Sequence, residues 1–392
     1  MTTIRIPWRA WYGDDWLELS FPPSWYVRAY WPADASDIGP MGIERALDAP
    51  IDAPPIEEMA RGKRWVSIAV DDISRPAPAA RIMPSLMRRL ERAGVDLDRV
   101  RVVLGTGTHR PMVKEDIIKK IGRAAADRLD VYNNHPYDNV VDLGSSDRGT
   151  PVHVCRFFAE ADLKIGVGSI TPHGNPGFGG GAKVVIPGVA GIDTIASIHQ
   201  PSRLQSALIE VEHNEFRTEI EHIARDKVGL DYIINVVTNS HREIAGLFVG
   251  DMVSAHRAGV RLARQVYATE MPAEPVDIAI CNAYPKDTDF LQSGMALNVL
   301  RSSPRPVVKE GGMIVIITAS PEGRGYHGLF GPGMRYDLRC GDTERRASPT
   351  PWDARIVYFS PWLTSADVGG DAVFRRWDDL IEHLAARYGD EV

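Results

Sequence analysis

Short apolar runs alternate with amphipathic stretches through the first two thirds of the chain. Three runs have the length and composition of buried strands: residues 64–70 (RWVSIAV), 100–105 (VRVVLG) and 161–170 (ADLKIGVGSI). Helical spacing of apolar positions follows them at residues 80–94 (ARIMPSLMRRLERAG), 113–122 (VKEDIIKKIG) and 193–200 (DTIASIHQ). This repeated order of strand, loop and helix predicts a parallel, doubly wound sheet.

The remaining patterns predict a second, similar domain. In residues 17–32, apolar and polar side chains alternate as in short β-strands. Before residue 254 we expect a long helical stretch, and a further helix then begins at residue 254 and runs into a linker. Three further strands are then expected at residues 276–281, 311–318 and 354–359. We therefore predict an α/β protein of two domains, residues 1–268 and 269–392, each with a largely parallel sheet flanked by helices and with the active site between them. Whether the last helix packs back on the N-terminal domain is left open.

Composition and net charge limit the kinds of molecule that this chain is expected to bind. The chain has 392 residues, a net charge of −7 and an apolar fraction of 44%, and its isoelectric point is about 5.9. An acidic protein lacks the basic face that nucleic acid or an anionic membrane requires, so neither is expected as a partner. The charged N-terminal segment has no signal-peptide core, and Cys155, Cys281 and Cys340 are too few and too far apart for a disulfide framework. We expect a cytoplasmic protein.

Polar and glycine-rich segments directly follow the predicted strands. They are DDISRP (71–76), GTGTHRP (105–111), TPHGNPGFGGGAK (171–183), NAYPKD (282–287) and SPEGRGYHG (320–328). Ligands of open parallel sheets bind at the carboxyl ends of the strands. These five loops therefore indicate one shared site.

The loop that ends at Lys183 is the densest in glycine. A phosphate-binding P-loop needs Gly-Lys-Ser/Thr, and here Ala182 precedes the lysine and Val184 follows it. The segment GTGTHR likewise lacks the last glycine of the dinucleotide fingerprint. Backbone N–H groups of a glycine-rich loop can still hold a phosphate. The alternative is a tight turn that carries a surface lysine.

Five side chains in or near these loops are candidates for chemistry. His109 and His173 follow strand ends, where histidine suits proton transfer near neutral pH, or both histidines are loop residues bonded to backbone carbonyls. Arg75 suits a substrate carboxylate and Asp72 suits orienting a histidine, or the two form a helix cap and a salt bridge. His199 stands alone near a helix end, so it binds a metal only if a cofactor supplies the other ligands.

Taken together, these segments resemble the lactate racemase family. The resemblance rests on DDISRP, GTGTHRPM, PHGNPGFGGGAKVVIPG, IHQ, YPKDTDFLQ and SPEGRGYHG, which occur in that family's order between about residues 70 and 328. It implies an isomerase that racemises or epimerises a 2-hydroxy acid. The implied chemistry is a proton-coupled hydride transfer: a histidine takes the hydroxyl proton, the hydride leaves carbon 2, and the 2-oxo acid is reduced again on its other face.

The resemblance also implies a cofactor and a set of site residues. The cofactor is a nickel-pincer nucleotide, pyridinium-3,5-bisthiocarboxylic acid mononucleotide, tethered to Lys183, with Ni²⁺ bound by the cofactor and by His199. His109 and His173 match the acid/base pair, and Asp72 and Arg75 match the polar residues of the first strand end. The residues expected to contact the cofactor besides Lys183 are Gly105, Thr106, Gly107, Thr108, Gly179, Gly180 and Gly181. The expected partners are the small-molecule 2-hydroxy acid and the proteins that make and load the cofactor.

One segment departs from the lactate-specific members of the family. Those members have a tyrosine, a glutamine and a lysine where this chain has Leu291, Gln292 and Met295 in YPKDTDFLQSGMA. Loss of the lysine removes a carboxylate partner, so a 2-hydroxy acid other than lactate is the expected substrate, with Arg75 as its cation. Arg324 and His327 are possible substitute contacts. The alternatives are a lactate racemase with a rearranged carboxylate site and a non-catalytic protein that binds or stores the cofactor.

Overall fold

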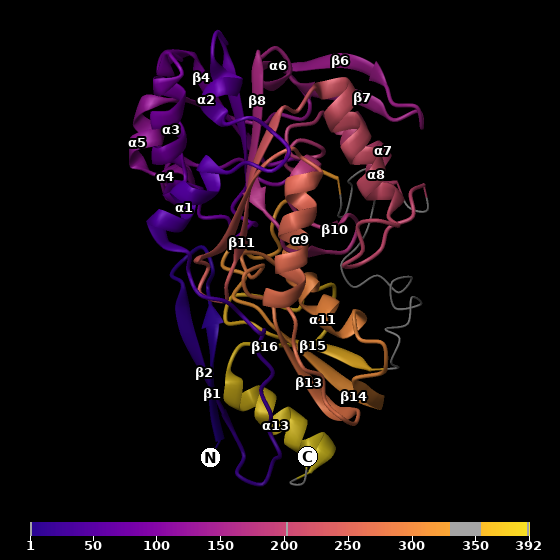
Figure 1. The fold of residues 1–392 in the computed structure, drawn as a ribbon. Coiled ribbons are helices and arrows are strands. Elements are labelled where there is room, and N and C mark those ends of the chain that lie inside the picture. The colour runs from indigo at the N-terminus through magenta and orange to yellow at the C-terminus, as the bar shows by residue number, and fades with distance from the viewer. Residues whose placement is uncertain (1, 201–202, 330–353, 390–391) are drawn as a thin grey trace. The chain divides into compact units, whose positions relative to one another are not determined.

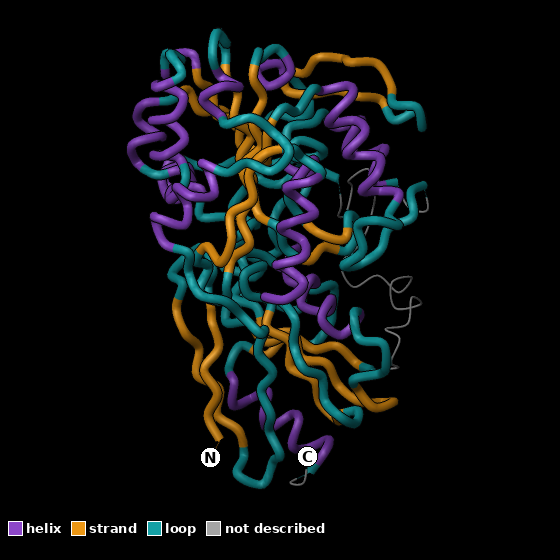
Figure 2. The backbone as a smooth tube through the Cα atoms, viewed as in Figure 1, coloured by secondary structure: helices purple, strands orange, loops and turns teal. Residues whose placement is uncertain are grey.

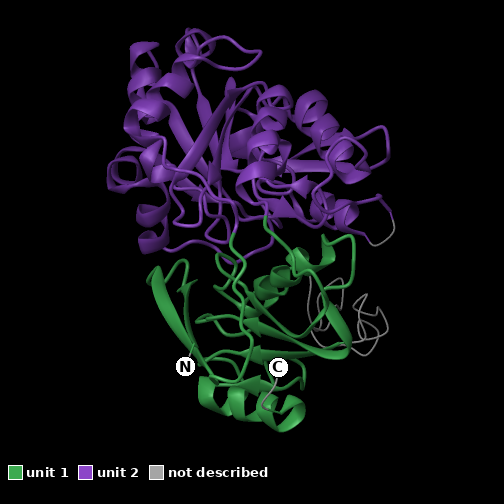
Figure 3. Ribbon diagram, turned by 60° about the horizontal axis from the view of Figure 1, so that its bottom comes forward, with its two compact units in different colours: residues 1–31, 269–392 green, residues 32–268 purple. Residues whose placement is uncertain are grey.

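The chain folds into two compact units that are discontinuous in sequence. The structure, a computed structural model, describes residues 2–200, 203–329, 354–389 and 392. Unit 1 comprises Met1–Trp31 and Thr269–Val392, and unit 2 comprises Pro32–Ala268 (Figure 3). The division into domains 1–268 and 269–392 stays a prediction. In the structure, residues 1–31 belong to unit 1 and not to the unit of the segment that follows them. Their apolar side chains pack on the sheet of unit 1 instead.

Unit 2 contains a six-stranded sheet in the order β12-β11-β8-β3-β4-β5 (Figure 1). Its strands are β3 (Val66–Asp71), β4 (Val100–Gly105), β5 (Asp130–Asn133), β8 (Leu163–Ser169), β11 (Tyr232–Thr238) and β12 (Ile244–Gly250). All neighbours are parallel except the edge strand β12, which pairs antiparallel with β11. Every residue of β3 and β11 is buried, as expected of strands with both faces covered.

Helices and small ribbons surround this sheet (Figure 2). The helices are α1 (Gly39–Asp48), α2 (Ile56–Ala60), α3 (Met83–Arg92), α4 (Lys114–Ile121), α5 (Arg123–Arg128), α6 (Arg156–Ala159), α7 (Ile192–His199), α8 (Glu215–His222) and α9 (Ser254–Val266). The antiparallel ribbons are β6 (Val140–Ser145) with β7 (Pro151–Cys155), and β9 (Pro172–His173) with β10 (Gly177–Phe178).

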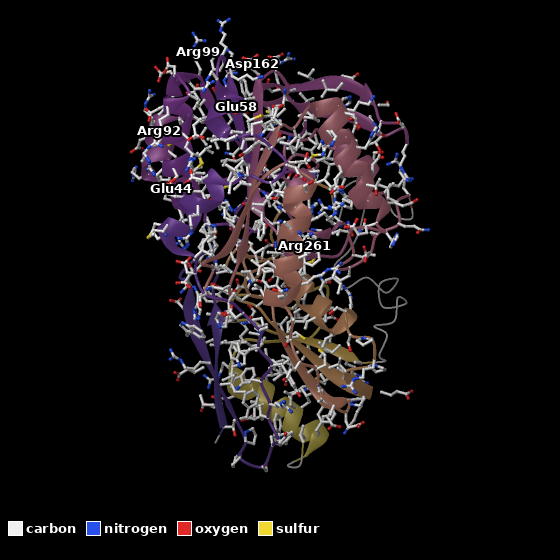
Figure 4. All side chains as sticks on the ribbon, in the orientation of Figure 1. Glu44, Glu58, Arg92, Arg99, Asp162 and Arg261 are labelled. Carbon is white, nitrogen blue, oxygen red and sulfur yellow. The ribbon has the colours of Figure 1, made fainter. Side chains whose placement is uncertain are left out.

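A buried arginine fastens the first three helices together. Arg89 of α3 donates to Glu44 of α1 (2.8 Å), to Asp48 at the end of α1 (2.6 Å) and to Glu57 of α2 (3.1 Å). Figure 4 labels Glu44 on its helix. A guanidinium with several carboxylates around it has the partners that a buried charge requires.

Unit 1 is built on a second, parallel sheet in the order β13-β14-β15-β16. The strands are β13 (Val276–Asn282), β14 (Val308–Ile317), β15 (Arg355–Phe359) and β16 (Val373–Phe374), and the hairpin β1 (Thr2–Trp8) with β2 (Asp15–Phe21) completes the unit with α10 (Phe290–Ser293), α11 (Asn298–Arg301) and α13 (Trp377–Tyr388). Side chains of β14 alternate between two cores. Val315 packs with the hairpin and α13, whereas Ile316 packs with Phe290 and Leu300.

The predicted fold class is confirmed, and most of the predicted strands and helices are present. The long helical stretch expected before residue 254 is wrong, because Tyr232–Thr238 and Ile244–Gly250 form β11 and β12. Their β-branched runs favour strands. Cys340 and Pro201 lie outside the described residues. In the part of the chain that the structure describes, no helix has the length and apolarity of a membrane span.

Candidate active site

Three of the predicted functional loops follow neighbouring strands of unit 2. β8, β3 and β4 are adjacent in the sheet, and their carboxyl ends lead into the loops that carry His173, Asp72 and His109. A hydrogen bond joins two of these ends directly, since Asp71 accepts the backbone N–H of Ser169 at 2.9 Å. The topology therefore brings together loops that are up to about a hundred residues apart in sequence.

Asp72 and His109 form a hydrogen-bonded pair. His109 Nδ1 lies against Asp72 Oδ2, and the Ser74 hydroxyl donates to the other carboxylate oxygen at 2.7 Å. Burial opposes ionisation of Asp72, but the charge and hydrogen bond of His109, together with Arg75, hold the pKa of this carboxyl below its usual value. A carboxylate can only accept, so Nδ1 of His109 carries the proton. The lone pair of the neutral ring is therefore on Nε2, as in a general base oriented by aspartate.

His173 has the opposite arrangement at its Nδ1 atom. It lies on β9, and its Nδ1 accepts the backbone N–H of Asn175 at 3.2 Å. A nitrogen that accepts a hydrogen bond carries no proton, so in the neutral ring the proton is on Nε2. The two predicted acid/base histidines are thus held in different tautomers.

A buried lysine that the sequence did not single out anchors the turn bearing Asp72 and Arg75. Lys120 of α4 donates to the backbone carbonyls of Asp72 (3.0 Å) and Arg75 (3.2 Å), and it forms an ion pair with Asp71 at 2.5 Å. Burial lowers the pKa of Lys120 despite this pairing. Within the amphipathic pattern of its helix this residue looks like an ordinary exposed charge, so only the tertiary structure identifies it.

Arg75 is partly buried beside this pair. Its Nη1 donates to the Ser74 hydroxyl at 3.1 Å and more weakly to the Ser74 carbonyl. In the described residues no carboxylate forms a salt bridge with it. Its guanidinium can therefore accept an anionic group of a ligand.

Two buried side chains hold the backbone of the glycine loop before Lys183. Arg217 of α8 donates to the carbonyls of Pro176, Phe178 and Gly180, and His256 of α9 donates to that of Gly179 at 2.8 Å. Burial lowers the pKa of Arg217 to about 10. Neither Arg217 nor His256 was identified from the sequence, where each lies within a helix pattern distant from the loop.

The glycines themselves are packed against other parts of unit 2. A Cβ atom on Gly179 would lie 2.8 Å from the Ser169 carbonyl oxygen, and one on Gly180, whose φ is +71°, would lie 2.7 Å from Asn235. The Gly181 N–H donates to Asn235 at 2.5 Å. These glycines thus pack closely inside unit 2, in the loop that leads to Lys183.

The segment Gly105–Thr108 packs on the far side of the same loop. A Cβ on Gly105 would lie 3.1 Å from the Val184 carbonyl oxygen, and the Gly107 N–H donates to Gly188 at 2.9 Å. Thr106 and Thr108 are buried. The strand end that carries His109 is therefore fixed to the turn that carries Lys183.

Lys183 is partly buried among other charged groups. In the described part of the chain its ammonium makes neither a hydrogen bond nor an ion pair. Burial and then the Arg75 guanidinium hold the pKa of Lys183 well below its usual value, with Asp72 acting in the opposite sense. A lysine in such surroundings is in part an uncharged amine, which is the nucleophilic form.

His199, at the end of α7, is oriented by its own helix. Its Nδ1 donates to the Ile195 carbonyl at 2.8 Å, which leaves the imidazole lone pair on Nε2. Burial lowers the pKa of His199 to about 4, and the charges of Lys183 and His109 act in the same direction. Lys183, His109 and His199 therefore lie within electrostatic reach of one another.

Three of the predicted substrate residues, Leu291, Gln292 and Met295, lie in unit 1, in the segment between β13 and β14. Leu291 and Gln292 are partly buried in α10, and Met295 is 38% exposed. The Leu291 N–H donates to the Arg324 carbonyl at 3.3 Å. Two loops that the sequence treats separately are thus joined.

Comparison with known proteins identifies the family. A family model described as the lactate racemase N-terminal domain matches residues 12–208. A lactate racemase from Lactiplantibacillus plantarum is 32% identical over 328 residues, which cover 80% of this chain and 76% of the relative. The chain belongs to the lactate racemase family. It is an isomerase of the racemase type.

Other relatives agree in sequence and in fold. A lactate racemase from Thermoanaerobacterium thermosaccharolyticum is 26% identical over 295 residues, covering 74% of this chain and 67% of the relative. The structure of the lactate racemase apoprotein from that organism superposes with a TM-score of 0.74 at 21% identity, over 99% of this chain and 96% of the other. A protein from Thermotoga maritima gives a TM-score of 0.66 at 17% identity, over 87% and 93%. The family resemblance is confirmed, whereas the individual site residues stay predictions.

Proposed function

We propose that this member of the lactate racemase family racemises or epimerises a 2-hydroxy acid other than lactate. The observation that carries the proposal is the cluster in unit 2, where the Asp72–His109 pair and the Arg75 guanidinium, which forms no salt bridge within the described residues, lie in the electrostatic environment of Lys183. A general base and an anion-binding group next to each other suit a substrate with neighbouring hydroxyl and carboxylate groups.

The residues of this cluster fit a nickel-pincer nucleotide. Lys183 offers an amine of lowered pKa for a covalent tether, and His199 offers an oriented Nε2 lone pair. Among the described residues no three or more His, Cys, Asp or Glu side chains gather as a metal site, so a nickel ion at His199 would take its other ligands from the nucleotide. When bound, this group would supply a reversible hydride acceptor for carbon 2 of the substrate.

The two histidines then have complementary starting states. His109 accepts the hydroxyl proton of one enantiomer on Nε2, while Asp72 stabilises the imidazolium that forms. His173, in its doubly protonated form, donates the proton on Nε2 to the oxygen of the 2-oxo acid as the hydrogen returns to the opposite face, and is left as a neutral ring. For the other enantiomer the roles are reversed. Arg75 binds the carboxylate and keeps carbon 2 in position.

The apolar side chains of Leu291 and Met295 favour a substrate larger than lactate. Both are apolar, and neither supplies a cation for a carboxylate. An apolar surface at this position favours a side chain bulkier or less polar than the methyl group of lactate.

A substrate survey tests this proposal. Protein loaded by co-expression with the cofactor-synthesis enzymes is incubated with single enantiomers of lactate and of bulkier 2-hydroxy acids, and kcat/KM is measured by chiral chromatography. We expect weak or absent lactate turnover and better turnover of a bulkier acid. Met295→Lys, alone or with Leu291→Tyr, is expected to shift the preference towards lactate.

The same survey separates the alternatives. Lactate as the best wild-type substrate would favour a lactate racemase with a rearranged carboxylate site. Loaded protein that carries nickel but turns over no acid in the panel would favour a protein that binds or stores the cofactor.

A further inference from the structure

The loops after β13 and β14 form a continuous hydrogen-bonded pair. Backbone N–H groups of one loop donate to carbonyls of the other in register, from Ser320 to Asp287 at 2.7 Å, from Glu322 to Thr288 at 3.2 Å, from Phe290 to Gly323 at 3.0 Å and from Leu291 to Arg324 at 3.3 Å. The parallel pairing of the strands thus continues past their carboxyl ends. Arg324 and Leu291 become fixed neighbours.

Arg324 is held in a backbone turn that only glycine neighbours allow. Gly323 and Gly325 have φ values of +64° and +81°, and a Cβ atom on Gly325 would lie 2.6 Å from the Asp289 side chain. A positive-φ glycine on each side, and the tight contact of Gly325, fix where this arginine leaves the backbone. Such a turn is suited to presenting one side chain.

Arg324 as a residue is partly buried, and in the described residues its guanidinium makes no hydrogen bond and no ion pair. A partly desolvated guanidinium without an acceptor is costly, and an anionic ligand removes this cost. The carboxylates of the same loops accept hydrogen bonds from other groups. Asp287 accepts from the backbone N–H groups of Arg9 and Ala10. Asp289 accepts from the backbone N–H of Gln292, and Glu322 accepts from the Tyr12 hydroxyl.

We propose that Arg324 binds a carboxylate of the substrate. This inference rests on the proposed function, because it assumes that the ligand at this site is a hydroxy acid. The carboxylate is either the one next to the reacting carbon or a second one at the far end of a diacid. The planar fork of arginine suits a bidentate contact with either.

Binding of substrate analogues that cannot react tests the proposal without turnover. 2-Hydroxy-2-methylpropanoate, its diacid counterpart 2-hydroxy-2-methylbutanedioate and the neutral 2-hydroxy-2-methylpropanamide have no hydrogen on carbon 2. Their dissociation constants for the loaded protein are measured by titration calorimetry in wild type, Arg324→Gln and Arg324→Lys. Arg387→Gln is the matched control, because this exposed arginine of α13 donates to Gly311 near the amino end of β14.

Loss of a charge-assisted contact is expected to weaken binding roughly 10- to 100-fold in Arg324→Gln. Arg324→Lys is expected to recover part of this loss, and Arg387→Gln to bind as wild type does. If Arg324→Gln binds both acids more weakly, Arg324 contacts the carboxylate next to carbon 2. If it binds only the diacid more weakly, Arg324 contacts the second carboxylate. The proposal is overturned if Arg324→Gln binds both acids as wild type does, or if wild type binds neither acid more tightly than the amide. Arg324-dependent binding in a protein without racemase activity would contradict the proposed function but not this inference.

Discussion

At the scale of single residues, the partners of Nδ1 decide what each histidine can do. His109 faces a carboxylate and His173 faces a backbone N–H, so chemically identical neutral rings are held in different tautomers. The sequence places both histidines at strand ends but gives no information on tautomers, because these depend on contacts across the fold. Asp72 is an exception, since its proximity to His109 follows from the adjacency of their strands.

Nitrogen-15 NMR of histidine-labelled protein measures these tautomers directly. We expect the neutral rings to carry the proton on Nδ1 in His109 and on Nε2 in His173, and resonances are assigned with His109→Gln and His173→Gln. Asp72→Asn is expected to disturb the His109 pattern and to leave that of His173 unchanged. The same tautomer at both positions would contradict the assigned roles.

Lys183 makes the stability of the cofactor-free protein depend on pH. Its pKa is lowered in the folded state and is 10.5 when unperturbed, so between these values the unfolded chain binds more protons than the folded one. The free energy of unfolding should therefore rise with pH over this range. Lys183→Met lacks this contribution and should be more stable than wild type at lower pH. This difference in the free energy of unfolding should shrink as the pH rises towards 10.

Urea unfolding between pH 6 and 10 measures this difference. Lys309→Met, at an exposed lysine paired with Asp277, controls for the loss of one surface charge. A gap between wild type and Lys183→Met that is independent of pH would show that the amine is ordinarily solvated.

At the scale of elements, the glycine loop shows what the sequence could predict and what it could not. The density of glycine and the final lysine indicate a functional loop, and the strands and helices around it follow from periodicity. The fastening of its carbonyls by Arg217 and His256 could not be predicted, because both residues come from helices far along the chain. The sequence pattern did not predict strands β11 and β12 for a related reason. They lie between segments with helical patterns, and the helical interpretation of those segments covered them as well.

Replacing one loop glycine should separate stability from cofactor attachment. Gly180→Ala places a side chain at φ +71° and against Asn235, whereas Gly229→Ala has the same φ and no atom within 4 Å. Gly229→Ala, in the left-handed helical region, is expected to lower the free energy of unfolding by roughly 1 kcal/mol, and Gly180→Ala by more, because its ψ of −172° lies in a region that only glycine readily adopts. Only Gly180→Ala should also reduce the adduct on Lys183.

Intact-mass spectrometry of co-expressed protein measures the attached fraction, and peptide mapping localises it. Equal adduct in the two variants would show that the loop does not position the lysine. An adduct that persists in Lys183→Ala would place the tether elsewhere.

At the scale of the whole molecule, the fold class and family were accessible from sequence because the motifs occupy strand ends in a fixed order. The assignment of residues 1–31 to unit 1 was not, since it depends on which apolar surface the hairpin covers. The substrate is the least predictable property. In the proposed function and the further inference it depends on Leu291, Met295 and Arg324, which lie in segments whose backbone pairing appears only in the folded chain.

The fate of the hydrogen on carbon 2 tests the central claim most directly. A single enantiomer of the preferred 2-hydroxy acid, deuterated at carbon 2, is racemised by loaded protein in ordinary water, with Lys183→Ala as the inactive control. Hydride transfer to and from a tethered cofactor predicts that the opposite enantiomer retains its deuterium. If the opposite enantiomer has lost its deuterium to water, the hydrogen on carbon 2 leaves as a proton. That result would contradict the account.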